Sequence, residues 1–151
     1  MARSYSADYS GAVGSASYHQ LCLFMATAAG VRAKLYEFTV SSGATPADNA
    51  SKLQVVRSTT AAPTGGAAPT IAPLDMADPA ALASAYDAAT GGETMSTVLM
   101  LVSVNQRATF RWVAAPTKEF VCPNTQYAGV GLQSLAQSAA YNLDLTIFWE
   151  E

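Results

Sequence analysis

Few residues in this sequence have the chemistry that a catalytic or metal-binding site requires. The only histidine, His19, stands three positions before Cys22, and the second cysteine, Cys122, is far away in the sequence. A cysteine and a histidine can perform nucleophilic catalysis when a third group orients the histidine, but residues three apart on one strand point to opposite faces. Zinc sites use closely spaced sets of cysteine and histidine, and this chain has no such set. The sequence therefore predicts no catalytic residue, no metal ligand and no cofactor, and it favours a protein that is not an enzyme.

The two cysteines are predicted to be free thiols. The first residues, "MARSYSADYSG", lack the apolar segment of a signal peptide, so we expect synthesis in a reducing cytoplasm. Cys22 lies in the apolar stretch "QLCLFMA" and fits a small buried side chain, whereas Cys122 precedes Pro123 and fits the end of a strand. A disulfide between the two cysteines is the alternative.

Acidic residues in expected loops are the other candidates for a site. Carboxylates there can hold a calcium ion or a sugar, but these aspartates lack the Asp-x-Asp spacing of a loop cation site. Aspartate is also common in turns, where it accepts hydrogen bonds from the backbone, and we prefer this interpretation. The four residues are Asp48, Asp75, Asp78 and Asp87.

The composition limits the kind of partner that the protein can have. Charged residues are 13% of the 151 residues, apolar residues are 50%, and the formal net charge is −3. Nucleic-acid binding depends on clustered lysine and arginine, which are scattered here, and no apolar stretch reaches the roughly 18–20 residues that span a bilayer. The sequence therefore predicts neither a nucleic-acid partner nor a membrane. A weakly charged surface needs little desolvation on contact with another protein, which favours a protein partner.

Most of the chain consists of short apolar runs with a period of two, separated by glycine and proline. This pattern predicts an all-β fold in a single domain over residues 1–151. The expected strands are "SYSADYS", "HQLCLFMA", "RAKLYEFTV", "KLQVVRST", "STVLMLVSV", "TFRWVAA", "KEFVC", "AGVGLQSLA" and "YNLDLTIFWE".

Two of these runs predict where their strands lie in a sheet. In "YNLDLTIFWE", the residues Leu143, Leu145, Ile147 and Trp149 share one face, which we expect to be part of the core. In "STVLMLVSV" nearly every position is apolar, which is typical of a central strand that is covered on both faces.

The run "VRAKLYEFTV" contains a change of phase. Its apolar positions are first Val31, Ala33 and Leu35, and then shift by one residue. One extra residue in a strand exchanges the faces of the residues that follow it. We therefore expect a β-bulge near Leu35 and Tyr36.

A long connection, residues 58–92, separates the strand runs. It is rich in proline, glycine and alanine, and loops longer than about 12–15 residues in compact domains are usually functional or disordered. A disordered linker would be poor in apolar residues, whereas this one contains several of them. We expect an arm that lies along a surface, either of its own domain or of a neighbour. The prolines and large apolar residues on which this expectation rests are Pro63, Pro69, Ile71, Pro73, Leu74, Met76, Leu82 and Tyr86.

One part of this connection fits a short helix. "DPAALASAYDAATGG" offers Asp78 as an N-cap, Pro79 at the first helical position, and Gly91 with Gly92 as a stop signal. Short helices are marginal in isolation, so an irregular excursion is the alternative.

The two tryptophans also have two possible roles: Trp149 is expected in the core, and Trp112 fits either the core or an interface.

The ordered set of landmarks resembles the small head decoration (cement) proteins of tailed bacteriophages. The landmarks are "KLQVVRSTT", the connection "APTGGAAPTIAPLD", the strand with Trp112 followed by "APTKE", and the final "LDLTIFWEE". The resemblance extends from about Val31 onward. It implies a jelly-roll-like antiparallel β-sandwich, often trimeric, that is bound to the outside of the capsid lattice. It also implies that residues 59–75 are an arm that reaches a neighbour.

The resemblance implies a function, a partner and a location. The expected function is to bind the assembled head and stabilise it, the expected partner is the major capsid protein, and the expected location is the capsid exterior of the virion. The alternatives are a carbohydrate-binding β-sandwich, such as a receptor-binding or lectin-like module, and another small virion part such as a tail or neck subunit. The expected partner contacts are Pro63, Pro69, Ile71, Pro73, Leu74, Tyr86 and Trp112.

Overall fold

A computed structural model of the chain describes residues 2–13, 18–25, 30–59, 61–89, 94–135 and 141–151. These residues form eleven strands and no helix, which confirms the all-β prediction. The strands are β1 (Ser4–Val13), β2 (Tyr18–Met25), β3 (Lys34–Ser42), β4 (Ala50–Ser58), β5 (Ala72–Pro73), β6 (Ala83–Ala89), β7 (Met95–Asn105), β8 (Phe110–Val113), β9 (Phe120–Val121), β10 (Gly129–Ser134) and β11 (Tyr141–Glu150).

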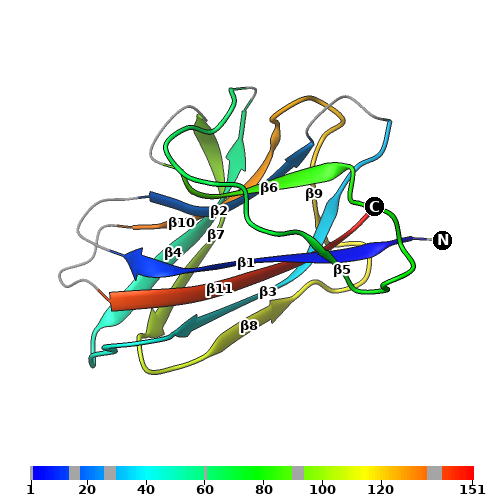
Figure 1. Cartoon of the computed structure of the whole chain (residues 1–151). Helices are drawn as coiled ribbons and strands as arrows, with labels where there is room; N and C mark the ends of the chain where they lie inside the picture. The colour runs from blue at the N-terminus through cyan, green and yellow to red at the C-terminus, as the bar shows by residue number, and fades with distance from the viewer. Residues whose placement is uncertain (1, 14–17, 26–29, 60, 90–93, 136–140) are drawn as a thin grey trace.

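The strands form two antiparallel sheets that pack as a sandwich (Figure 1). The first sheet has the order β5-β1-β11-β3-β8, with β9 also paired to β3, and the second has the order β6-β2-β10-β4-β7. Every expected strand is present, and β5 and β6 are the two that the sequence analysis missed.

The strand pairing is that of a jelly roll. Without the additional strands β5, β6 and β9, eight principal strands remain, and they pair first with last and so on inwards: β1 with β11, β2 with β10, β3 with β8 and β4 with β7. This is the pairing of one long antiparallel ribbon that is folded over on itself, and it yields a double-sheet jelly roll. The expected jelly-roll-like sandwich is therefore confirmed.

The core lies between the sheets and follows the alternation seen in the sequence. Leu143, Leu145, Ile147 and Trp149 of β11 are all buried, as predicted. The ring of Tyr5 in β1 stacks on Trp149 with their centroids 5.8 Å apart. The predicted role of Trp149 in the core is therefore confirmed.

The expected β-bulge is present in β3. Trp149 pairs with Leu35 and Phe148 pairs with Glu37, so Tyr36 is the extra residue. Leu35, before it, and Phe38, two positions after it, are both buried. The bulge therefore keeps both halves of β3 facing the core despite the change of phase.

Two expectations about local structure are wrong. The segment with the helix pattern contains β6 instead, which pairs with β2; the buried Ala83 and Ala85 alternate with half-buried residues along this strand. The predicted stop signal, Gly91 and Gly92, lies outside the described residues. The strand β7 was expected to be central, but it is at the edge of the second sheet.

The alternation of β11 can be tested with a matched pair of substitutions. We expect Ile147→Ala, which empties a fully buried position, to lower the free energy of unfolding by about 2–5 kcal/mol. Thr146→Ala on the opposite face should cost less than about 1 kcal/mol. Urea unfolding curves measure both values, and equal losses would contradict the assignment of faces.

Candidate interaction surfaces

The described side chains form no cluster suited to metal or covalent chemistry. No group of three His, Cys, Asp or Glu side chains that could hold a metal ion is found among them. Cys22 and Cys122 are buried free thiols, as predicted. Burial raises the pKa of Cys122 from 9.0 to about 12, and a thiol that stays protonated is a poor nucleophile. His19 belongs to β2, but its side chain lies outside the described part of the molecule.

Each of the four aspartates contacts either a backbone N–H group or a basic side chain. The contact of Asp78 with Arg3 is described below. Asp48 is exposed and pairs with Arg107 at 3.2 Å. Asp75 forms a turn in which its Oδ1 accepts a hydrogen bond from the backbone N–H of Ala77 at 2.9 Å. Asp87 belongs to β6 rather than to a loop, and its carboxylate accepts a hydrogen bond from the N–H of Ala67 at 3.0 Å.

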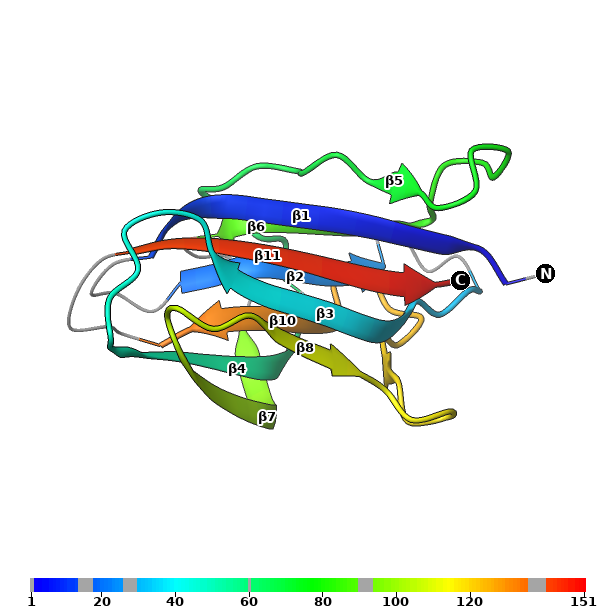
Figure 2. The ribbon, with the colours of Figure 1, turned by 90° about the horizontal axis from the view of Figure 1, so that it is seen from below.

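The long connection lies along its own domain. Figure 2 shows it beside β1, where β5 extends the first sheet. The N–H of Leu74 donates to the carbonyl of Ser4 at 2.8 Å, and Ala67 exchanges two backbone hydrogen bonds with Asp87 of β6. The connection therefore covers the side of the sandwich formed by β1 and β2. Of the two surfaces that the sequence left open, the described part of the connection lies along its own domain, and the reach of residues 59–75 towards a neighbour stays a prediction.

Most of the residues that we expected to contact a partner pack against their own domain or bond to it. Ile71 packs against the core, and the Tyr86 hydroxyl donates to the carbonyl of Gly66 at 3.0 Å. Pro63, Pro69 and Pro73 are half-buried. Leu74 is the most exposed of the set, at 53%. Trp112 does not join them, because β8 and β5 are the opposite edges of the first sheet.

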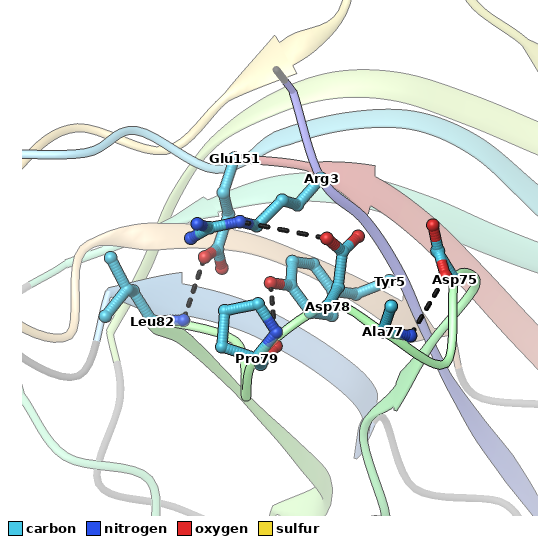
Figure 3. A network of polar contacts seen from close by, with 8 residues as sticks. All are labelled: Arg3, Tyr5, Asp75, Ala77, Asp78, Pro79, Leu82 and Glu151. Atoms are coloured by element: carbon cyan, nitrogen blue, oxygen red, sulfur yellow. Dashed lines mark hydrogen bonds and ion pairs between the residues drawn. The ribbon is translucent and has the colours of Figure 1, made fainter.

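A group of polar contacts, which we call the Glu151 clasp, holds the end of the connection (Figure 3). The Glu151 carboxylate accepts hydrogen bonds from the N–H groups of Leu82 at 2.8 Å and Ala83 at 2.7 Å. The Tyr5 hydroxyl donates to the carbonyl of Pro79 at 3.1 Å. Burial, followed by the charge of Glu151, raises the pKa of Tyr5, so its hydroxyl keeps the proton that it donates. Arg3 approaches Asp78 at 3.9 Å on the outside.

The clasp presents a loop, residues 74–82, that carries exposed apolar side chains. Met76 is 97% exposed, and Leu74 and Leu82 are 53% and 44% exposed. An open pocket beside this clasped loop is lined by Ala2, Ser4, Leu74, Asp75 and Asp78. Patches of exposed apolar side chains mark contact surfaces for other proteins, so the clasped loop is a candidate for such a surface. The sequence analysis noted Met76 but did not include it among the expected contacts.

Trp112 closes the edge of the core rather than standing free. Its ring stacks on Phe120 with centroids 4.7 Å apart and on Phe38 with centroids 5.3 Å apart. It remains half-buried. Of its two expected roles, the structure supports packing against the core.

The edge strand β7 is the second exposed apolar feature. Leu101 is 68% exposed and Val98 is 47% exposed. The sequence analysis missed this edge, because an uninterrupted apolar run has the same appearance in a covered central strand as in an exposed edge strand. Only the pairing of β7 with β4 alone, within the described part of the chain, distinguishes the two cases.

Comparisons of the chain with protein-family models, with curated proteins and with solved structures find no match. The described residues also contain no helix with the length and apolarity needed to cross a bilayer.

The Glu151 clasp leads to a first prediction for this region. Hydrogen bonds to charged groups contribute about 1.5–3 kcal/mol, so we expect Glu151→Gln to lower the free energy of opening of the clasped loop by about that amount. Amide hydrogen exchange at Leu82 and Ala83 should become faster by a factor of ten or more. The control is Glu150→Gln, because Glu150 bonds to Lys34 instead. Equal exchange rates in both variants would contradict the role of the clasp.

Burial of Cys122 leads to a prediction about pH. Its pKa in the folded state is raised to about 12, above the value of an exposed thiol. Unfolding at alkaline pH therefore releases a proton, so this contribution to stability is present below about pH 9 and is lost as the pH rises towards 12. We expect Cys122→Ala to make the free energy of unfolding fall less steeply across this range, as measured by urea unfolding at each pH. An unchanged slope would contradict the raised pKa.

Proposed function

We propose that this protein is a structural virion protein, a decoration protein that binds the outer surface of an assembled tailed-phage head and stabilises it. The observation that carries the proposal is the jelly-roll strand order, with β1 paired to β11 and β2 to β10. Jelly rolls are the fold of viral capsid proteins, and also of lectins and cupins. The resemblance of the strand and connection sequences to phage cement proteins favours the first of these classes.

The aromatic side chains give little support to the carbohydrate-binding alternative. Sugar-binding sites use open aromatic faces, and Trp112, Tyr86 and Tyr127 are the available candidates. Trp112 stacks on two other rings, the Tyr86 hydroxyl is bonded to Gly66, and Tyr127 packs against Phe24 with centroids 5.8 Å apart. Each ring therefore has a role in its own domain.

The surface that we assign to the capsid is the clasped loop. Met76 and Leu74 offer apolar area, and the Glu151 clasp holds the backbone behind them. A loop that is already ordered loses little conformational entropy on binding. The proposed partner is the major capsid protein, and Asp75, which lines the open pocket beside the loop, would favour a basic group there.

Stabilisation follows from binding only the assembled state. A protein that binds neighbouring capsid subunits in the shell, and not the free subunits, shifts the equilibrium towards the shell by mass action. Many weak contacts that repeat over a lattice then act together. The resemblance implies trimers on the shell, and the location of the protein would be the exterior of the capsid.

The test is to mix the purified protein with undecorated capsid shells, sediment the particles, and count bound copies against the major capsid protein. We expect saturation at a fixed lattice ratio and shells that resist heat better. Burial of a methionine contributes about 1.5–3 kcal/mol, so Met76→Lys should weaken binding by roughly tenfold to a hundredfold. Val113→Lys is the matched control, because Val113 is 51% exposed on β8, away from the loop.

Failure to bind shells would contradict the decoration role, and a glycan array would then test the carbohydrate-binding alternative. Binding that Met76→Lys leaves unchanged would preserve the decoration role but move the capsid contact away from the clasped loop.

A further inference from the structure

The two sheets have four edges, and three of them are short or covered. In the first sheet, β5 has only two residues and ends in Pro73, and β8 has only four residues. In the second sheet, β6 is bonded at Asp87 to Ala67 of the connection. Short strands, proline and covering segments are the means by which natural β proteins prevent edges from pairing with other chains.

The fourth edge, β7, is long, and among the described residues it pairs with β4 alone. Its 11 residues, "MSTVLMLVSVN", contain no charge and no proline. Its irregularities of register with β4 lie in its first half, and Met100–Asn105 pair regularly with Ala50–Val55. Figure 2 shows β7 beside β4, on the side of the molecule away from β5. The regular half of β7 thus leaves one side of its backbone available for another strand.

We propose that β7 pairs antiparallel with β7 of a second copy of this chain, which joins two five-stranded sheets into one. This proposal goes beyond the decoration role and does not depend on it. A second copy is the occupant that we favour because the charge-free sequence of β7 can face itself without repulsion. Within that copy, β7 is the edge that matches in length, because the other edges are shorter or covered. Self-pairing about a two-fold axis also makes the contact identical on both copies.

The sequence of β7 is complementary to itself about Leu101. With the axis at this residue, Leu101 lies opposite its own copy and Met100 lies opposite Val102. Val98, opposite Val104, belongs to the half of β7 whose register with β4 is irregular, so the pairing is centred on the regular half. Leu99 lies opposite Ser103. Like charges that face each other across a pair are destabilising, and this register contains none. Leu101 is also the most exposed apolar residue of the strand, at 68%, so pairing brings the two largest apolar exposures into contact with each other.

The size of the contact predicts a reversible dimer. The register about Leu101 pairs Thr97–Asn105 of the two copies. At about 3.3 Å per residue this segment is about 30 Å long, and a strip roughly 10 Å wide along it covers on the order of 300 Å² on each copy. Stable complexes bury at least about 1,200 Å² in total, which is more than two such strips. We therefore expect a dimer that forms at high protein concentration and dissociates on dilution.

Sedimentation equilibrium of the purified full chain tests the proposal. We expect the mass to rise from monomer to dimer with concentration, and Leu101→Lys, which places two positive charges opposite each other on the axis, to raise the dissociation constant at least tenfold. Val113→Lys is the matched control, because it introduces the same charge at an exposed apolar residue of the other sheet. It should leave the dimer intact.

A cross-link gives a second readout that does not depend on weakening the contact between the two copies. Residues that lie directly opposite in an antiparallel pair have Cβ atoms about 4.5–5.5 Å apart, so under mild oxidation Leu101→Cys should form a covalent dimer. Val113→Cys should remain monomeric, and the buried native thiols should not interfere.

A monomer at every concentration up to millimolar would overturn the proposal. So would an assembly of any size, including the trimer that the resemblance implies, whose mass does not respond to Leu101→Lys and which Leu101→Cys does not cross-link. Shell binding is assayed separately, so either result leaves the decoration role to its own test.

Discussion

The pairing of β1 with β11 is the constraint on which the rest of the molecule depends. These strands stay in register over ten residue pairs, from Ser4 opposite Glu150 to Val13 opposite Tyr141. The pairing closes the long ribbon and fixes the positions of all inner pairs. It also stacks Tyr5 on Trp149 and brings Arg3 to Glu151, where two backbone hydrogen bonds of 3.1 and 2.9 Å join the residues. The Glu151 clasp is therefore a direct product of this register.

The clasp in turn explains why the two sides of the sandwich differ. The connection between β4 and β7 is long enough to return along β1 and β2, and the clasp holds it there through Leu82 and Ala83. That side carries additional strands in both sheets. The other side ends in β7 and β8, without such a cover among the described residues. A single long connection thus divides the surface into a covered side, with the exposed loop at its end, and an open side.

The sequence was sufficient for whatever depends on local alternation. The core face of β11 and the bulge at Tyr36 follow from periods of two residues and one change of phase, and both are present. The position of β7 could not be predicted, because an apolar run does not record how many strands lie beside it. The prediction of a helix in the segment that contains β6 failed for a related reason. Its alanines have high helix propensity, but pairing with β2 and burial of Ala83 and Ala85 decide its structure. The clasp joins residues about seventy positions apart, and no spacing pattern indicates such a contact.

The geometry of β1 and β11 also determines how the domain would respond to force. Their hydrogen bonds run across the strands, and Arg3 and Glu151 lie side by side at one end of the pair. A pull that separates these two residues therefore loads the hydrogen bonds one after another, as in a zipper, instead of all together. The first interactions under load would be those at Glu151, so tension at this end would release the clasped loop before the core opens.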